Sequence, residues 1–267
     1  MTPQETSAGN SEEPGENAPP DSNTADFGYR RVQSDAKAGL VRGVFDSVAG
    51  RYDVMNDLMS GGIHRLWKST MIDRLAPRPG ERFLDVAGGT GDIARRILDR
   101  AGPTAQVILC DINEAMLNQG RDRAIDANIL AGIEYVAGDA EHLPIASGTI
   151  DAYAIAFGLR NVTRIETALR EARRVLRPGG RFFCLEFSHV APDFLARAYD
   201  LYSFNVLPVL GRIVAGDRDS YQYLVESIRR FPPQEALAAM MRAAGLEQVR
   251  FRDYTFGVAA LHTGWRL

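Results

Sequence analysis

Residues 84–92, Leu-Asp-Val-Ala-Gly-Gly-Thr-Gly-Asp, constrain the fold of this chain more than any other stretch. A short apolar run, Phe83 to Val86, follows the breaker Pro79-Gly80, and apolar residues recur at helical spacing after Asp92. The stretch therefore predicts a strand, a glycine turn and a helix. Glycines in such a turn adopt positive φ and leave room for a ligand, while the helix start offers unpaired N–H groups. We predict a nucleotide-like ligand at this turn.

Two classes of ligand satisfy the turn. Residues 89–94, Gly-Thr-Gly-Asp-Ile-Ala, match the fingerprint of dinucleotide-binding folds, and Asp111 ends the next expected strand, where a carboxylate accepts both ribose hydroxyls. A dinucleotide brings a pyrophosphate, which Asp92 on the first helical turn disfavours. S-adenosylmethionine (SAM) carries an ammonium and a sulfonium but only one carboxylate, so Asp85 and Asp92 suit it better. The acidic residues favour SAM; a tight turn without a ligand is the remaining interpretation.

Strand-like and helical patterns alternate along the rest of the chain. The expected strands are residues 83–86, 105–111, 133–137, 150–156, 181–187, 246–254 and 258–265. Alternation followed by a closing hairpin predicts an α/β, doubly wound, mostly parallel seven-stranded sheet with an antiparallel last strand. This Rossmann-like arrangement resembles class I SAM-dependent methyltransferases rather than a six-stranded, all-parallel dinucleotide domain.

Polar residues follow two further strands at the carboxyl edge of the expected sheet, where open α/β sheets bind ligands. Asp139 can accept a hydrogen bond from an adenine amino group, and Ala140 offers its backbone N–H to the ring; the alternative for Asp139 is a turn residue. Arg160 and Asn161 follow a buried apolar strand, and an arginine there is costly unless it meets an anion. We predict that both pairs contact ligands.

Composition divides the chain into parts. Residues 1–26 are rich in Pro, Gly, Ser and Glu and hold six acids but no Lys or Arg, which predicts a disordered acidic tail. Residues 27–267 form the predicted ligand-binding domain. Within it, residues 27–78 precede the first strand, and we expect a helical lid, with a plain pair of capping helices as the alternative. Residues from about 193 to 230 form an apolar helical insertion, which either packs as a subdomain or lines a channel for a long apolar substrate.

The remaining composition excludes several classes of protein. Cys110 and Cys184 lie in apolar runs, as expected of buried free thiols in a reducing compartment. The four histidines show no ligand spacing, so we predict no metal. The sequence has no run of 18 apolar residues and no signal-peptide pattern, which predicts a cytoplasmic protein. The formal charge is −3, and the acidic tail leaves a slightly basic body. This small surplus suits an anionic membrane surface, with an ordinary solvated exterior as the alternative, and does not indicate nucleic acid.

Several blocks of sequence match one family. They are residues 44–49, 52–53, 55–57, 62–68, 84–92, 155–162, 175–181, 185–188, 203–204, 207–208 and 259–262. In these blocks the chain resembles the ubiquinone/menaquinone biosynthesis C-methyltransferases of the UbiE type, from about Phe27 to Leu267. Gly-Gly-Thr-Gly alone suits many methyltransferases. The blocks between residues 44 and 68, in the expected lid, together with residues 157–161, Phe-Gly-Leu-Arg-Asn, are specific to this family.

The resemblance implies SAM as the cofactor. Asp111 would hold the ribose and Asp139 with Ala140 the adenine. The methionine end would lie on the glycine turn, at Asp85, Gly88, Gly89, Thr90 and Gly91. A frequent pattern of the family has Asn before the Ala, whereas Asp139 accepts but does not donate a hydrogen bond when ionised.

The resemblance also implies methyl transfer to a ring carbon of a polyprenylated benzoquinol, of demethylmenaquinol, or of both. We expect Arg160 and Asn161 to hold the quinol oxygens and Tyr52 to complete the pocket as catalytic residues. Asp53 and His64 are alternatives. The lipophilic substrate implies a transient peripheral contact at the inner face of the membrane, and a homodimer or a quinone-biosynthesis assembly stays open.

Three other functions compete with this one. A SAM-dependent O-methyltransferase acting on another phenol would use the same core. A nicotinamide oxidoreductase would bind NAD(P)H at the glycine turn. A non-catalytic SAM-binding scaffold would bind the cofactor weakly or not at all.

Overall fold

A computed structural model describes residues 23–48, 57, 60–190 and 218–267 of the chain. Most of the expected acidic tail, the predicted catalytic residue Tyr52 and residues 193–217 of the expected insertion lie outside the described residues. No helix within the described ranges is both long and apolar enough to cross a membrane.

The central sheet has seven strands in the spatial order β5-β4-β3-β6-β7-β9-β8. The strands are β3 (Arg82–Val86), β4 (Gln106–Asp111), β5 (Ile133–Ala137), β6 (Ile150–Ala156), β7 (Leu176–Phe187), β8 (Glu247–Tyr254) and β9 (Ala259–Arg266). The five strands from β3 to β7 are parallel to their neighbours among themselves, whereas β9 runs antiparallel to both β7 and β8. The predicted fold class is therefore confirmed. The central strands are nearly continuous apolar runs because helices cover both faces of a parallel sheet.

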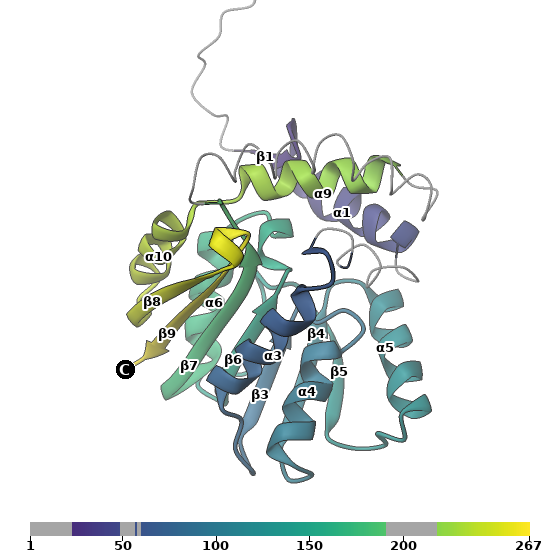
Figure 1. Cartoon of the computed structure of the whole chain (residues 1–267), viewed down its shortest axis with the longest axis vertical. Helices are drawn as coiled ribbons and strands as arrows, with labels where there is room; N and C mark the ends of the chain where they lie inside the picture. Colours follow the sequence, from purple (N-terminus) through teal and green to yellow (C-terminus); the bar gives the residue numbers. More distant parts are fainter. Residues whose placement is uncertain (1–22, 49–56, 58–59, 191–217) are drawn as a thin grey trace, which may run out of the picture.

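Alternate residues of each strand feed two hydrophobic cores, one on each face of the sheet. Side chains of α3, α4, α5 and α9 complete the first core, and side chains of α6 and α10 complete the second. The helices are α1 (Ser34–Val48), α3 (His64–Leu75), α4 (Asp92–Ala101), α5 (Glu114–Asp126), α6 (Ile165–Val175), α9 (Arg218–Arg230) and α10 (Gln234–Ala243), with short 3-10 turns η2 (Leu159–Asn161) and η4 (Thr255–Gly257). Figure 1 shows α1 and α9 side by side across one end of the sheet.

A two-stranded hairpin begins the described part of the chain, where the sequence predicted the end of a disordered tail and a purely helical lid. Its strands are β1 (Thr24–Phe27) and β2 (Arg30–Gln33), so β1 overlaps the expected tail of residues 1–26. The ring of Phe27 stacks on that of Tyr223 in α9 at 4.3 Å between centroids, and this contact offsets the entropy of ordering the hairpin. Each of these strands has only four residues, and so short a segment shows no clear alternation of apolar and polar residues in the sequence.

Candidate active site

The glycine turn after β3 has the left-handed backbone that its sequence predicted. Ala87, Gly89 and Gly91 have φ of 50°, 54° and 82°. A side chain on Gly88 would place its Cβ 2.1 Å from Leu109 Cδ1, so glycine is needed there for packing against β4. The turn therefore brings the start of α4 close to the ends of the central strands.

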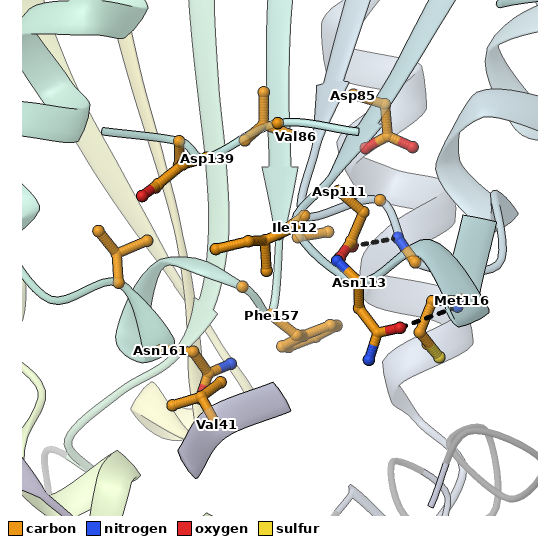
Figure 2. A pocket seen from close by; sticks show the side chains of 18 of the residues that line it. Val41, Asp85, Val86, Asp111, Ile112, Asn113, Met116, Asp139, Phe157 and Asn161 are labelled. Atoms are coloured by element: carbon orange, nitrogen blue, oxygen red, sulfur yellow. Dashed lines mark hydrogen bonds between the residues drawn. The ribbon is translucent and has the colours of Figure 1, made fainter. Parts of the chain in front are cut away.

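One cavity lies at the carboxyl ends of β3, β4, β5 and β6, where the order of the strands reverses. Figure 2 shows Asp85, Asp111 and Asp139 around it, with Asn161 on another side. Of the predicted cofactor-binding residues, those that line the cavity are Asp85, Gly88, Gly89, Thr90, Asp111, Asp139 and Ala140. Gly91 is absent from the lining. It is the residue before α4, and its positive φ turns the backbone into that helix.

Asp111 joins the glycine turn to the end of β4. One carboxylate oxygen accepts from the Gly89 N–H at 2.8 Å and the other from the Asn113 N–H at 2.9 Å. Burial raises the pKa of Asp111, although these two backbone hydrogen bonds act in the opposite direction. Asn113 in turn caps α5, because its Oδ1 accepts from Ala115 and Met116 N–H groups (Figure 2). Each carboxylate oxygen has a second lone pair, so Asp111 can still accept from a ribose hydroxyl.

Asp139 and Ala140 form the opposite wall of the cavity. The Asp139 carboxylate accepts from the Glu141 N–H at 2.9 Å, which shapes the turn after β5. Glu141 then accepts from the N–H groups of Thr163 and Arg164 at 3.1 Å and 2.9 Å. This carboxylate therefore attaches the turn to the N-terminus of α6, where negative charge is favourable.

Asp85 is fully buried beside the glycine turn, and burial raises the pKa of its carboxyl to about 8. One oxygen accepts from the Ala94 N–H at 3.1 Å. The other, Oδ1, has no hydrogen-bond partner in the part of the chain that the structure describes. Burial would also raise the pKa of Asp92, but Lys68 and Arg96 lower it to about 2. The site thus offers one buried carboxyl oxygen that can still accept a hydrogen bond and one carboxylate that is already paired.

Asn161 lines this cavity, as predicted, and the hydroxyl of Tyr223 donates to its Oδ1 at 3.1 Å. Arg160 instead lines an adjoining cavity under α1 and α9. Its guanidinium is fully buried and forms an ion pair with Glu186 at 2.6 Å. The structure therefore brings Asn161, and not the Arg160 side chain, to the residues predicted to bind SAM.

His64 holds the start of α3 together. Its Nδ1 lies 3.1 Å from Ser60 Oγ and 3.5 Å from the Asp57 carboxylate. Burial and the charge of Lys68 lower its pKa to about 4, so the ring is neutral at physiological pH. It does not line the cavity, in agreement with a structural role.

The sequence as a whole matches the ubiE/COQ5 methyltransferase family over residues 29–266. The chain belongs to this family. It is 60% identical over 244 residues to the ubiquinone/menaquinone biosynthesis C-methyltransferase UbiE of Dinoroseobacter shibae, covering 91% of this chain and 97% of the relative. The protein of the same name from Paracoccus denitrificans is 61% identical over 241 residues, covering 90% and 96%. A SAM-dependent methyltransferase of Thermotoga maritima has the same fold, with a TM-score of 0.60 at 19% identity, covering 85% of this chain and all of that one.

Family membership confirms the prediction of a methyltransferase, and with it SAM as the cofactor. The residues of this methyltransferase fit that molecule. Asp111 and Asp139 both line the cavity and can accept hydrogen bonds, which a ribose and an adenine would donate, and the Asp85 oxygen without a described partner could accept from an ammonium. Asp92 on the first turn of α4 is a poor neighbour for a pyrophosphate, which argues against a dinucleotide.

Sequence reasoning did not single out Val41, Arg42, Lys68 and Glu141, which line the cavity of this methyltransferase, or Tyr223, which contacts Asn161. Val41 and Lys68 come from helices before the first sheet strand, and no local pattern shows which face of those helices covers the site. Glu141 was readable as part of the loop after β5, but its partners lie 22 and 23 residues later. Tyr223 was one of many aromatic residues in the apolar insertion.

Proposed function

We propose that this methyltransferase transfers the methyl group of SAM to a ring carbon of a polyprenylated benzoquinol, of demethylmenaquinol, or of both, in ubiquinone/menaquinone biosynthesis. The observation that carries the proposal is the 60% identity to a C-methyltransferase of that named pathway over nearly its full length. The cavity supports it, because its lining combines the carboxylates with apolar side chains that include Val41, Ile112 and Phe157. Such a lining suits a flat ring with an apolar tail.

Asn161 is the residue that we propose to bind the quinol. An aromatic carbon is a weak nucleophile, so a ring hydroxyl must lose its proton before electron density reaches the carbon. Since the Tyr223 hydroxyl donates to Oδ1, the amide nitrogen of Asn161 is the group that donates into the cavity. A donor aimed at a quinol oxygen stabilises the phenolate. Tyr223 is then a positioning residue.

Arg160 has a different role in this proposal from the one that its sequence position suggested. Its guanidinium also donates to the Phe157 carbonyl at 2.7 Å, besides its ion pair with Glu186. We propose that Arg160 joins the ends of β6 and β7 and so holds η2, with Asn161, against the cavity. The role of Tyr52, which lies outside the described residues, stays a prediction.

A peripheral membrane contact follows from the lipophilic substrate. Leu66 on α3 and Phe256 on η4 are 65% and 68% exposed, and a hydrogen bond from Trp67 Nε1 to Thr255 Oγ1, at 3.1 Å, joins the residues beside them. We propose that both side chains insert into a bilayer surface. Sedimentation with anionic vesicles should fall for L66S/F256S and not for the control L130S, on the exposed turn after α5. Equal sedimentation of all three proteins would contradict this contact.

Quinone profiling tests the proposed function directly. Cells that lack this chain should accumulate demethylated quinone, which wild type should clear and N161A should clear at least tenfold more slowly. The control L130S should behave as wild type. Fragmentation of the product in the mass spectrometer distinguishes a C-methyl from an O-methyl group. An O-methyl product would show that the protein is an O-methyltransferase instead. Unchanged quinones in the deleted strain would end the substrate assignment.

A further inference from the structure

Lys68 is a buried cation at the methionine end of the cofactor cavity. It comes from α3, which precedes the first strand of the central sheet, and it lines the cavity together with Asp85 and Asp92. The residue is only 4% exposed. Its Nζ lies 2.9 Å from Asp92 Oδ2 and 5.9 Å from the centroid of the Phe157 ring.

The charge of Lys68 is only partly balanced. Arg96 Nε also binds the Asp92 carboxylate, at Oδ1 and 2.9 Å, so one carboxylate serves two cations. The other nearby acid, Asp85, accepts a hydrogen bond from the Ala94 N–H. Burying an ammonium is costly unless anions balance it. Lys68 therefore shares its ion-pair partner with Arg96 and can bind a second anion in the cavity.

The amino-acid end of SAM offers Lys68 a second anion. It carries an ammonium, for which the orphaned Oδ1 of Asp85 is the acceptor, and a carboxylate, for which the described carboxylates around the cavity are repulsive. Lysine has three donors, of which Asp92 takes one. We propose that Lys68 binds the carboxylate of SAM, so that α3 contacts the amino-acid end of the cofactor. The proposal depends on SAM as the cofactor and not on the identity of the methyl acceptor.

Calorimetry with three ligands tests this role in the full chain. S-adenosylhomocysteine carries the carboxylate, decarboxylated SAM lacks it, and methylthioadenosine lacks the whole amino-acid end. For K68M we expect the affinity for S-adenosylhomocysteine to fall about 10- to 100-fold, which is the usual effect of losing a hydrogen bond to a charged group. The affinities for the other two ligands should stay within about threefold of wild type, and K68R should recover most of the loss.

R96M is the matched control, because Arg96 binds the same Asp92 carboxylate but does not line the cavity. It should leave all three affinities within about threefold of wild type. Circular dichroism melts check that each variant folds. If K68M weakens all three ligands equally, Lys68 only holds α3 against α4 and the proposal is wrong. Unchanged affinity of folded K68M for S-adenosylhomocysteine would also overturn it.

Discussion

Replacing Asp85 by Asn should remove a pH dependence of folding stability that the wild-type methyltransferase shows between about pH 6 and about pH 8. Asp85 is fully buried at β3, and burial raises the pKa of its carboxyl from 3.8 to about 8. The Ala94 N–H and the Lys68 ammonium lower this pKa, whereas the carboxylates of Asp92 and Asp111 raise it. Without cofactor the group is therefore mostly protonated at neutral pH, although it is ionised in the unfolded chain.

The sign and size of the effect follow from proton counting. Between the two pKa values the folded protein holds one proton more than the unfolded chain, so stability falls as the pH rises. The slope is about 1.4 kcal/mol per pH unit, so wild type should lose about 2 kcal/mol relative to D85N between about pH 6 and about pH 7.5. Above about pH 8 the folded group ionises as well, and the loss ends. All other titratable groups are common to both proteins, so their contributions cancel in the difference.

Urea unfolding followed by tryptophan fluorescence, without cofactor and at a series of pH values, measures this difference. A difference that stays constant across the window would refute the reasoning, because it would mean that Asp85 is ionised in the folded protein throughout. The same proton gives a second readout. If Asp85 ionises to meet the ammonium of SAM, SAM affinity should rise up to about tenfold per pH unit below the pKa, and D85N should lack this rise.

Three further variants test other contacts of the site. D111N should weaken SAM binding about 10- to 100-fold by calorimetry, because it removes a charged acceptor for the ribose; an unchanged dissociation constant would contradict that role. G158A would place a Cβ 2.4 Å from Ala87 Cβ, so we expect a loss of about 1–3 kcal/mol in urea unfolding, and wild-type stability would show that the two strand ends can separate freely. R160M should cost about 3–5 kcal/mol, since it leaves the Glu186 carboxylate buried without its ion pair, and adding E186Q should recover at least half; a double variant as unstable as R160M would argue against the charge as the cause.

Local sequence was sufficient for the sheet and for most of the cofactor site. Asp85, Asp111 and Asp139 each lie near the carboxyl end of an apolar strand, and parallel strands necessarily bring their carboxyl ends to one edge. Seven of the eight predicted cofactor-binding residues therefore line one cavity. The eighth, Gly91, belongs to the same turn, where its positive φ is needed for the backbone conformation of the turn.

The sequence by itself determined the fold class and the family, and it predicted a set of residues of which most line one cavity, because these depend on the period of apolar residues and on patterns within continuous stretches. Only the tertiary structure decided which partner each charged group has. It paired Arg160 with Glu186, 26 residues away, and placed Lys68 beside Asp92, 24 residues away. Such pairs depend on the register of whole helices and strands packed against one another, and periodicity shows which face of an element is buried but not what it meets there.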